Sequence, residues 1–248
     1  MEGIQNILSR FEPINLQQMD AVKLMDRTDR KFAFLYQQLP QLLQELEPFY
    51  HVLEIANTRV SRYRSLYFDD DKLALYHQHH NGRCNRVKVR HRTYVESNLA
   101  FWEVKMKNNK GRTIKNRMPL AEVPLNLSSD LSNFVLEKVG FNAQALQATV
   151  WVNYQRITLV NKHSPERLTI DINLQIEHPT QQLQFPNFVI AEVKQPKRSY
   201  SPFFNLAKHL KIREGSLSKY CLAISLIHPK VKQNNFKRKI KQLSTLLH

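Results

Sequence analysis

Hydrophobic and polar residues alternate along several segments in the middle of the chain. In 167–176 (RLTIDINLQI), aliphatic residues occupy every second position and polar residues lie between them. Because successive side chains of a strand point to opposite faces, this pattern predicts a strand with one buried and one polar face. Similar segments, separated by turn-forming sequences, predict further strands over 59–69, 85–94, 99–107, 111–118, 150–161 and 187–194.

Helical periodicity is present in four other segments. In 37–47, leucines recur three and four residues apart, which predicts an amphipathic helix with one face in the core. A Ser/Asp signal for a helix start precedes 128–139, and further helices are expected over 201–211 and 216–227. Together these elements predict an α+β fold that is mainly an antiparallel sheet.

The polar faces of the predicted strands carry recurrent cations. Segment 86–94 (RVKVRHRTY) places a cation at every second position, and three other strands add more. The charged residues on these faces are Arg86, Lys88, Arg90, Arg92, Glu103, Lys105, Lys107, Lys115, Arg117, Glu192 and Lys194. An ordinary solvated face explains any one strand. Recurrence over several strands favours a closed barrel with a charged interior, covered outside by helices.

The composition indicates a globular protein with an anionic partner. The 248 residues are 42% hydrophobic, and 37 Lys and Arg outnumber 21 acidic residues, for a net charge of +16. We expect a single domain over 1–248, with nucleic acid, a polyphosphate-like ligand or an acidic membrane surface as the partner. Two distant cysteines, Cys84 and Cys221, indicate neither a disulfide framework nor a zinc site. With no signal peptide or transmembrane segment visible, we expect a cytoplasmic protein.

The charged faces suit phosphate chemistry. Glycine is scarce and no phosphate-binding loop motif is present, so side chains must hold any phosphate. Arg binds phosphate oxygens through two parallel hydrogen bonds, and Lys supplies a compact charge. Glu103, Asp171 and Glu192 on the same faces are suited to Mg²⁺ or Mn²⁺, which bridges carboxylate and phosphate. Phosphoryl transfer depends mainly on such positioning and charge neutralisation.

Three alternatives remain open at this level. Cations on exposed strands near tyrosines could instead track a nucleic-acid backbone, although no recognised nucleic-acid motif is visible. His77 and His79, on one face of a predicted strand, have a spacing that could hold a transition metal, although surface histidines are commoner. The segment 230–248 predicts a basic amphipathic helix that docks on the domain or makes a peripheral contact with an acidic surface.

Taken in order, several motifs resemble the VTC domain, the polyphosphate polymerase domain of the triphosphate tunnel metalloenzyme (CYTH-like) superfamily. The motifs are DRTDRKF, SLYFDDDKLALYHQHHNGRCNRVKVRHRTY, FWEVKMKNNKGRTIKNR, VNYQRITL, RLTIDINL, IAEVKQPK and SKYCLAI, over a core of about 25–228. The resemblance implies an eight-stranded antiparallel β-barrel that forms a charged tunnel, with helices packed outside. It also implies a divalent metal and the partners ATP or another triphosphate and inorganic polyphosphate, with no DNA expected.

The resemblance also implies roles for individual residues. Phosphate binding falls on Lys31, Arg90, Arg92, Lys105, Lys115, Arg156, Arg167, Lys194 and Lys219. Among these, Arg90, Arg92 and Lys219 are the expected catalytic residues. Glu192 is the expected metal ligand, and Glu103 and Asp171 are candidates for additional ligands.

The implied activity is the transfer of the γ-phosphoryl group of ATP to polyphosphate. Triphosphatase and adenylate cyclase activities also occur in the superfamily, since a fold does not fix a function. Ser216 stands where eukaryotic polymerase members have a further lysine, which leaves the handling of a growing chain less determined than triphosphate binding.

Overall fold

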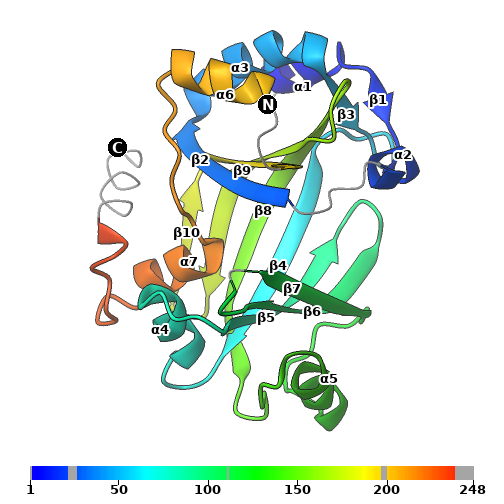
Figure 1. Cartoon of the computed structure of the whole chain (residues 1–248). Coiled ribbons are helices and arrows are strands. Elements are labelled where there is room, and N and C mark those ends of the chain that lie inside the picture. Colours follow the sequence, from blue (N-terminus) through cyan, green and yellow to red (C-terminus); the bar gives the residue numbers. More distant parts are fainter. Residues whose placement is uncertain (1, 22–26, 111, 197–199, 238–248) are drawn as a thin grey trace.

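The computed structural model describes residues 2–21, 27–110, 112–196 and 200–237. The strands are β1 (Pro13–Ile14), β2 (Arg27–Leu35), β3 (Tyr50–Leu53), β4 (Ser61–Asp69), β5 (Arg86–Tyr94), β6 (Leu99–Lys107), β7 (Thr113–Pro119), β8 (Gln147–Asn161), β9 (Arg167–His178), β10 (Gln181–Phe185) and β11 (Phe188–Pro196). The α-helices are α1 (Glu2–Leu8), α2 (Leu16–Ala21), α3 (Leu39–Leu46), α4 (Ala74–His80), α5 (Ser129–Val139), α6 (Pro202–His209) and α7 (Lys219–Ile227). Two 3-10 turns, η1 (Tyr36–Gln38) and η2 (Glu47–Phe49), flank α3. These elements confirm the predicted α+β class (Figure 1).

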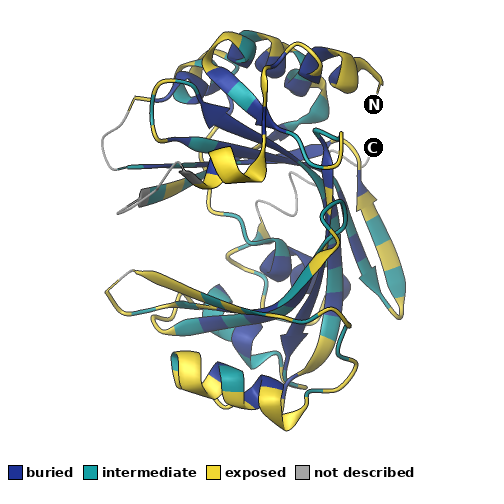
Figure 2. Cartoon of the chain, turned by 90° about the vertical axis from the view of Figure 1, so that its right-hand side faces the viewer, coloured by how far each residue is buried: buried dark blue, intermediate teal, exposed yellow. Residues whose placement is uncertain are grey.

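Eight strands form one continuous antiparallel path in the order β2-β11-β9-β8-β4-β5-β6-β7. Outside this path, β10 pairs with β9, β3 pairs with β8, and β1 pairs with β3 in parallel. The sheet is strongly curled, so that its two ends lie across from each other (Figure 2). Within the described residues the end strands β2 and β7 are not paired, so the predicted barrel is not closed by hydrogen bonds. We call the concave side the inner face and the convex side the outer face.

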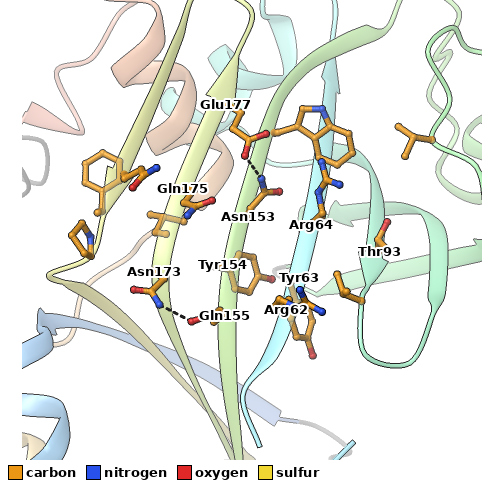
Figure 3. A pocket seen from close by; sticks show the side chains of 17 residues that line it. Arg62, Tyr63, Arg64, Thr93, Asn153, Tyr154, Gln155, Asn173, Gln175 and Glu177 are labelled. Carbon is orange, nitrogen blue, oxygen red and sulfur yellow. Dashed lines mark hydrogen bonds between the residues drawn. The ribbon is translucent and has the colours of Figure 1, made fainter. Parts of the chain in front are cut away.

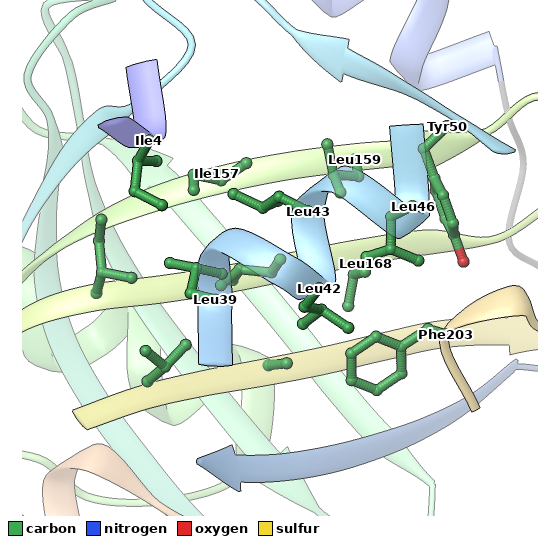
Figure 4. Close-up of a cluster of buried hydrophobic side chains, with 14 of the residues drawn as sticks. Ile4, Leu39, Leu42, Leu43, Leu46, Tyr50, Ile157, Leu159, Leu168 and Phe203 are labelled. Atoms are coloured by element: carbon green, nitrogen blue, oxygen red, sulfur yellow. The ribbon is translucent and has the colours of Figure 1, made fainter. Parts of the chain in front are cut away.

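Helices α1, α3 and α6 lie together over one part of the outer face (Figure 1). The predicted leucine stripe of α3 is fully buried: Leu39, Leu42, Leu43 and Leu46 each have 0% exposure. These leucines pack on aliphatic residues of β8 and β9 such as Leu159 and Leu168 (Figure 4). Burial of this amphipathic face stabilises a helix that would be marginal in isolation at its length.

A second hydrophobic cluster lies beneath α5. Its centre is Trp102 of β6, which is fully buried and whose indole Nε1 donates to the carbonyl oxygen of Leu131 at 3.3 Å. Val87 and Val89 of β5 belong to the same cluster. The alternate residues of β5 therefore point to the inner face, as the sequence pattern predicted.

Helix α4 corrects one prediction from sequence. The segment containing His77 and His79 was expected to be a strand, but it is a helix, and residues two apart do not share a helix face. The helix forms because the carboxylates of Asp69 and Asp70 accept hydrogen bonds from its first backbone amides. The strand geometry on which the alternative of a metal site at these two histidines depended is therefore absent.

The predicted C-terminal helix starts differently from expectation. Residues 230–236 form turns and irregular backbone in place of a helix, and 238–248 lie outside the described residues. Gln233 holds this turn by donating to the backbone oxygens of Ser225 and Pro229. None of the described helices is both long and apolar enough to span a membrane.

Candidate functional site

Three carboxylates of the inner face are each held between cations. Glu103 of β6 is 1% exposed and lies between two neighbouring strands. Its Oε2 accepts from Arg90 Nε at 2.7 Å and from Arg90 Nη2 at 2.6 Å. Its Oε1 lies 2.5 Å from Lys115 Nζ. Although burial alone raises the pKa of Glu103, the charges of Arg90, Arg92 and Lys115 hold that pKa well below its usual range.

Asp171 of β9 forms the second group. Its two oxygens accept from Arg156 Nε at 2.6 Å and Arg156 Nη2 at 2.8 Å, and Oδ2 also accepts from Lys219 Nζ at 2.5 Å. Burial tends to raise the pKa of Asp171, but Arg156 and Lys219 lower it to about 2. The Arg156 guanidinium also lies 4.8 Å from the ring centroid of Tyr63, and Lys219 Nζ lies 4.6 Å from that of Tyr154. This group therefore joins β8, β9 and the start of α7.

Glu192 of β11 forms the third group. Its Oε2 lies 2.5 Å from Lys194 Nζ, and its Oε1 lies 4.0 Å from Lys31 Nζ on β2. Lys194 Nζ is also 4.0 Å from an oxygen of Asp29. Burial tends to raise the pKa of Glu192, whereas Lys194 and Lys31 hold it well below its usual range. Unlike the other two carboxylates, Glu192 forms its ion pairs within 4.0 Å with lysines in the described chain, and the charge of Arg156 makes only a smaller contribution to its low pKa.

Other cations on the inner face bind neutral partners. Lys88 Nζ donates to Ser218 Oγ at 2.9 Å, and Lys31 Nζ donates to the carbonyl oxygen of Leu217 at 3.0 Å. Arg92, which is 7% exposed, donates from Nε to Ser65 Oγ at 3.0 Å. These cations can therefore bind an anion without first breaking an ion pair with a carboxylate at short distance.

A cavity of about 460 Å³ opens between the two ends of the curled sheet. Its lining combines residues of both ends with the segment before α7: Asp29, Lys31, His79, Arg86, Lys88, Lys105, Lys107, Thr113, Glu192, Glu214, Gly215, Ser216, Leu217, Ser218, Cys221 and Phe236. The register places Lys88 opposite Lys105 and Arg86 opposite Lys107, so two neighbouring rungs of the inner face carry cations alone. We call this cavity the lysine cleft.

The lysine cleft has a strongly positive electrostatic environment. Desolvation and the charges of Lys31 and Lys88 lower the pKa of Lys105 to about 8, against the opposing effect of Glu192. At Tyr67, burial favours the neutral phenol, but Arg90, Arg92 and Lys88 lower the pKa to about 8. The pKa values of Lys105 and Tyr67 are both lowered by nearby cations. Positive charge therefore exceeds negative charge around these two side chains. The inner face is therefore electrostatically suited to an anionic ligand.

Arg167 lies apart from the three carboxylate groups. Its Nη2 donates to the backbone oxygen of Met19 at 3.1 Å and lies 4.0 Å from Asp20 Oδ1, near α2. The register nevertheless places it beside Lys194. Of the nine basic residues expected from sequence, eight lie near the three carboxylates or in the lysine cleft, and Arg167 lies at the end next to α2.

The inner face offers limited protein ligation for a metal. Across the described ranges, no three His, Cys, Asp or Glu side chains lie close enough together to hold a metal ion. Glu103 and Asp171 already accept hydrogen bonds from arginine and lysine. Glu192 borders the lysine cleft and is bonded to lysines alone. The residues fit a divalent cation that takes one carboxylate from the protein and its other oxygen ligands from phosphates and water.

Several residues that shape the site were not among the site residues predicted from sequence. Lys88 was signalled by the alternation in 86–94, which placed it on the same face as Arg90. Tyr67, whose hydroxyl accepts from Arg90 Nη1 at 3.1 Å, was one of the tyrosines beside the cations in the nucleic-acid alternative, and Ser218 was only the first residue of the motif SKYCLAI. Their roles depend on contacts between strands and a helix that are distant in sequence.

A second cavity, of about 610 Å³, lies against β4, β8 and β9 and is lined mainly by polar side chains (Figure 3). Asn153 donates to Glu177 at 2.7 Å, and Asn173 donates to Gln155 at 2.6 Å. The Arg64 guanidinium lies 4.8 Å from the ring of Trp151. Several of these groups bond to one another, and the lining lacks the concentration of cations found in the lysine cleft. The lysine cleft is therefore the better candidate for an anion site.

The fold has relatives of known structure. A candidate adenylyl cyclase from Hippeastrum with a dominant triphosphatase activity is 16% identical, with a TM-score of 0.51, covering 81% of this chain and 96% of that protein. A candidate adenylate cyclase from Bacillus halodurans is 14% identical, with a TM-score of 0.48, covering 78% of this chain and 96% of that protein. At these identities the likeness concerns the fold.

Sequence comparison gives a family. No curated protein sequence matches the chain significantly. The family model described as the VTC domain matches residues 26–228, which include all the carboxylates and cations of the inner face described above. The chain therefore belongs to the VTC domain family.

Proposed function

We propose that this protein catalyses metal-dependent phosphoryl transfer on triphosphates, and specifically that it extends polyphosphate with the γ-phosphoryl group of ATP. The observation that carries the proposal is the lysine cleft. Its two cation pairs on β5 and β6 lie opposite the end of the sheet that bears Lys31 and Glu192. Few acidic side chains neutralise these four cations. Membership of the VTC domain family supports the same assignment.

The proposed roles follow from position. Arg90, Arg92 and Lys219 are the catalytic residues, and they neutralise the charge that develops on the transferring phosphoryl group. The remaining phosphate-binding residues are Lys31, Lys105, Lys115, Arg156, Arg167 and Lys194, to which the structure adds Lys88. Glu103 and Asp171 hold arginines in place, because two parallel hydrogen bonds fix the orientation of a guanidinium.

Glu192 is the proposed protein ligand of Mn²⁺ or Mg²⁺. A bound divalent cation would supply charge neutralisation and orientation at the phosphate oxygens. Lys194 and Lys31 keep the Glu192 carboxylate ionised, as a ligand oxygen must be. They also hold it at the border of the cleft, where phosphate oxygens can complete the coordination.

A triphosphatase is the second candidate. The Hippeastrum protein with dominant triphosphatase activity has the same fold, and Ser216 borders the cleft where eukaryotic polymerases have a lysine. Without that lysine, the cleft has one cation fewer and binds the acceptor polyphosphate chain less firmly. Water can then replace the acceptor chain as the nucleophile. In both cases the same residues bind the triphosphate.

Product analysis distinguishes the candidates. The purified protein is incubated with ATP and Mn²⁺, with and without a short polyphosphate primer, and the products are separated by gel electrophoresis and ion exchange. Polymer with ADP supports the proposal, whereas orthophosphate with ADP indicates a triphosphatase. Cyclic AMP with pyrophosphate indicates a cyclase. The absence of every product with either metal would refute the assignment as an enzyme.

A binding comparison tests the remaining alternative. A cleft built for triphosphate should bind tripolyphosphate more tightly than a single-stranded oligonucleotide at equal salt. A surface that tracks a nucleic-acid backbone should show the reverse order and a steep dependence on salt. Calorimetry with both ligands decides, and a clear preference for the oligonucleotide would contradict the phosphate-site assignment.

A further inference from the structure

The start of α7 binds four different strands through four consecutive residues. Each contact joins one residue of this segment to a strand residue on or near the inner face. The pairs are Leu217 with Lys31 of β2, Ser218 with Lys88 of β5, Lys219 with Asp171 of β9 and Tyr220 with Asp69 of β4. Three of the four pairs contain a proposed phosphate-binding lysine, and the fourth contains none. The fourth pair therefore needs a different explanation.

Asp69 is a fully buried carboxylate at the end of β4, with 0% exposure. Its Oδ1 accepts from the backbone amides of Asp70 at 2.9 Å and Leu75 at 2.8 Å. Its Oδ2 accepts from the amide of Tyr76 at 2.9 Å and from the hydroxyl of Tyr220. One side chain thus fixes the start of α4 and the first turn of α7 to the same strand end.

The Tyr220 ring continues this connection toward the phosphate site. It stacks on the ring of Tyr67, with centroids 5.0 Å apart and an interplanar angle of 26°. The Tyr67 hydroxyl in turn accepts from Arg90 Nη1 at 3.1 Å. Tyr220 is also the direct neighbour of Lys219, so its hydroxyl bond to Asp69 anchors Lys219, whereas the stack on Tyr67 depends on the ring and not on the hydroxyl.

We propose that Asp69 and Tyr220 are positioning residues of the phosphate site, and that their hydrogen bond sets the place of Lys219 relative to Asp171. The assignment of Lys219 to phosphate rests on the proposed function, but binding of inorganic tripolyphosphate tests the positioning role without any turnover. Neither Asp69 nor Tyr220 touches substrate. Their effect passes through the first turn of α7.

The test compares two buried tyrosines of the same chemistry. Tyr220→Phe removes the hydroxyl bound to Asp69, and Tyr50→Phe removes a hydroxyl bound to the buried carboxylate of Glu166 beneath the outer helices. Tyr50 and Tyr220 are 0% and 2% exposed, so both variants lose a buried hydrogen bond in a similar setting. We expect similar decreases in thermal stability for the two variants. Only Tyr220→Phe should weaken tripolyphosphate binding, by about tenfold, the change that a difference of about 1.4 kcal/mol produces.

A double-mutant cycle identifies the route of the effect. In a Lys219→Met background, Tyr220→Phe should change tripolyphosphate affinity by less than about twofold, because the side chain it positions is absent. Equal losses of affinity for Tyr220→Phe and Tyr50→Phe would overturn the proposal, as would an undiminished tenfold effect without Lys219. If the protein binds tripolyphosphate with this pattern but releases no product from ATP, the proposed activity fails while the positioning role stands.

Discussion

Replacement of Asp171 by asparagine tests whether this carboxylate is a structural partner of cations. Asp171 is 4% exposed and bonded to both Arg156 and Lys219. Its pKa is 3.8 ordinarily and about 2 in the fold. Since each pKa unit corresponds to about 1.4 kcal/mol, the ionised group stabilises the folded state by roughly 2 to 3 kcal/mol at neutral pH. Removing one partner of a buried ion pair typically costs about 3 to 5 kcal/mol.

We therefore expect Asp171→Asn to lower the free energy of unfolding by about 3 kcal/mol at pH 7. For a domain of this size that corresponds to a decrease in Tm of about 6 to 12 °C. Because the folded pKa is depressed, the stabilisation is complete above the unfolded pKa and is lost as pH falls through the folded value. The difference between wild type and variant should thus shrink by about 1 kcal/mol from pH 5 to pH 3.

Urea unfolding followed by fluorescence measures these differences. The control is Asp20→Asn, which removes an exposed carboxylate 4.0 Å from Arg167 and should change stability by no more than about 0.5 kcal/mol. Tripolyphosphate should restore much of the stability lost by Asp171→Asn, since its charge replaces the missing carboxylate. A loss below about 1 kcal/mol at pH 7 would refute the reasoning. So would a difference that does not change between pH 5 and pH 3.

Three further predictions concern the cleft and the core. Glu192→Gln should lower metal-dependent turnover by orders of magnitude, while tripolyphosphate should still bind in the absence of metal. The matched control Glu177→Gln, on strand β9, should retain turnover. Tripolyphosphate affinity should fall as pH rises through about 8, because Lys105 loses its proton and Tyr67 ionises. Calorimetry should show a weaker pH dependence for Lys105→Met and for Tyr67→Phe, and an unchanged profile in both would contradict the assignment. Leu43→Ala should destabilise the protein by about 2 to 5 kcal/mol in urea unfolding without changing affinity per folded molecule.

Local patterns in the sequence determined which face each strand residue occupies. A period of two placed Arg90 and Arg92 on the inner face and Val87 and Val89 in the core, as burial confirms. The leucine period likewise predicted the buried stripe of α3. Both patterns depend only on the spacing of residues that are close together in the chain. They therefore predict which residues are buried without knowledge of the fold.

The helix α4 and the strand β2 were missed for physical reasons. The first amides of α4 are satisfied by Asp69 and Asp70, whose carboxylates precede a helix too short for a clear hydrophobic period. From sequence, only the motif around Lys31 pointed to the segment of strand β2 (Arg27–Leu35), and no strand was predicted there. This strand pairs with β11, which is far away in the sequence. Register with a distant strand leaves no local signal.

The pairing of charges was decided by the tertiary structure alone. Sequence indicated that Glu103, Asp171 and Glu192 share a face with cations, and it offered all three as metal ligands. The fold brings Arg156 and Lys219 to Asp171 from a neighbouring strand and from α7, and leaves Glu192 with lysines at the border of the cleft. Period-two alternation specifies a face, but the identity of the partner depends on strand order, register and the docking of α7. Those are long-range properties, and they separate a carboxylate that holds an arginine from one that lies with lysines at the border of the cleft.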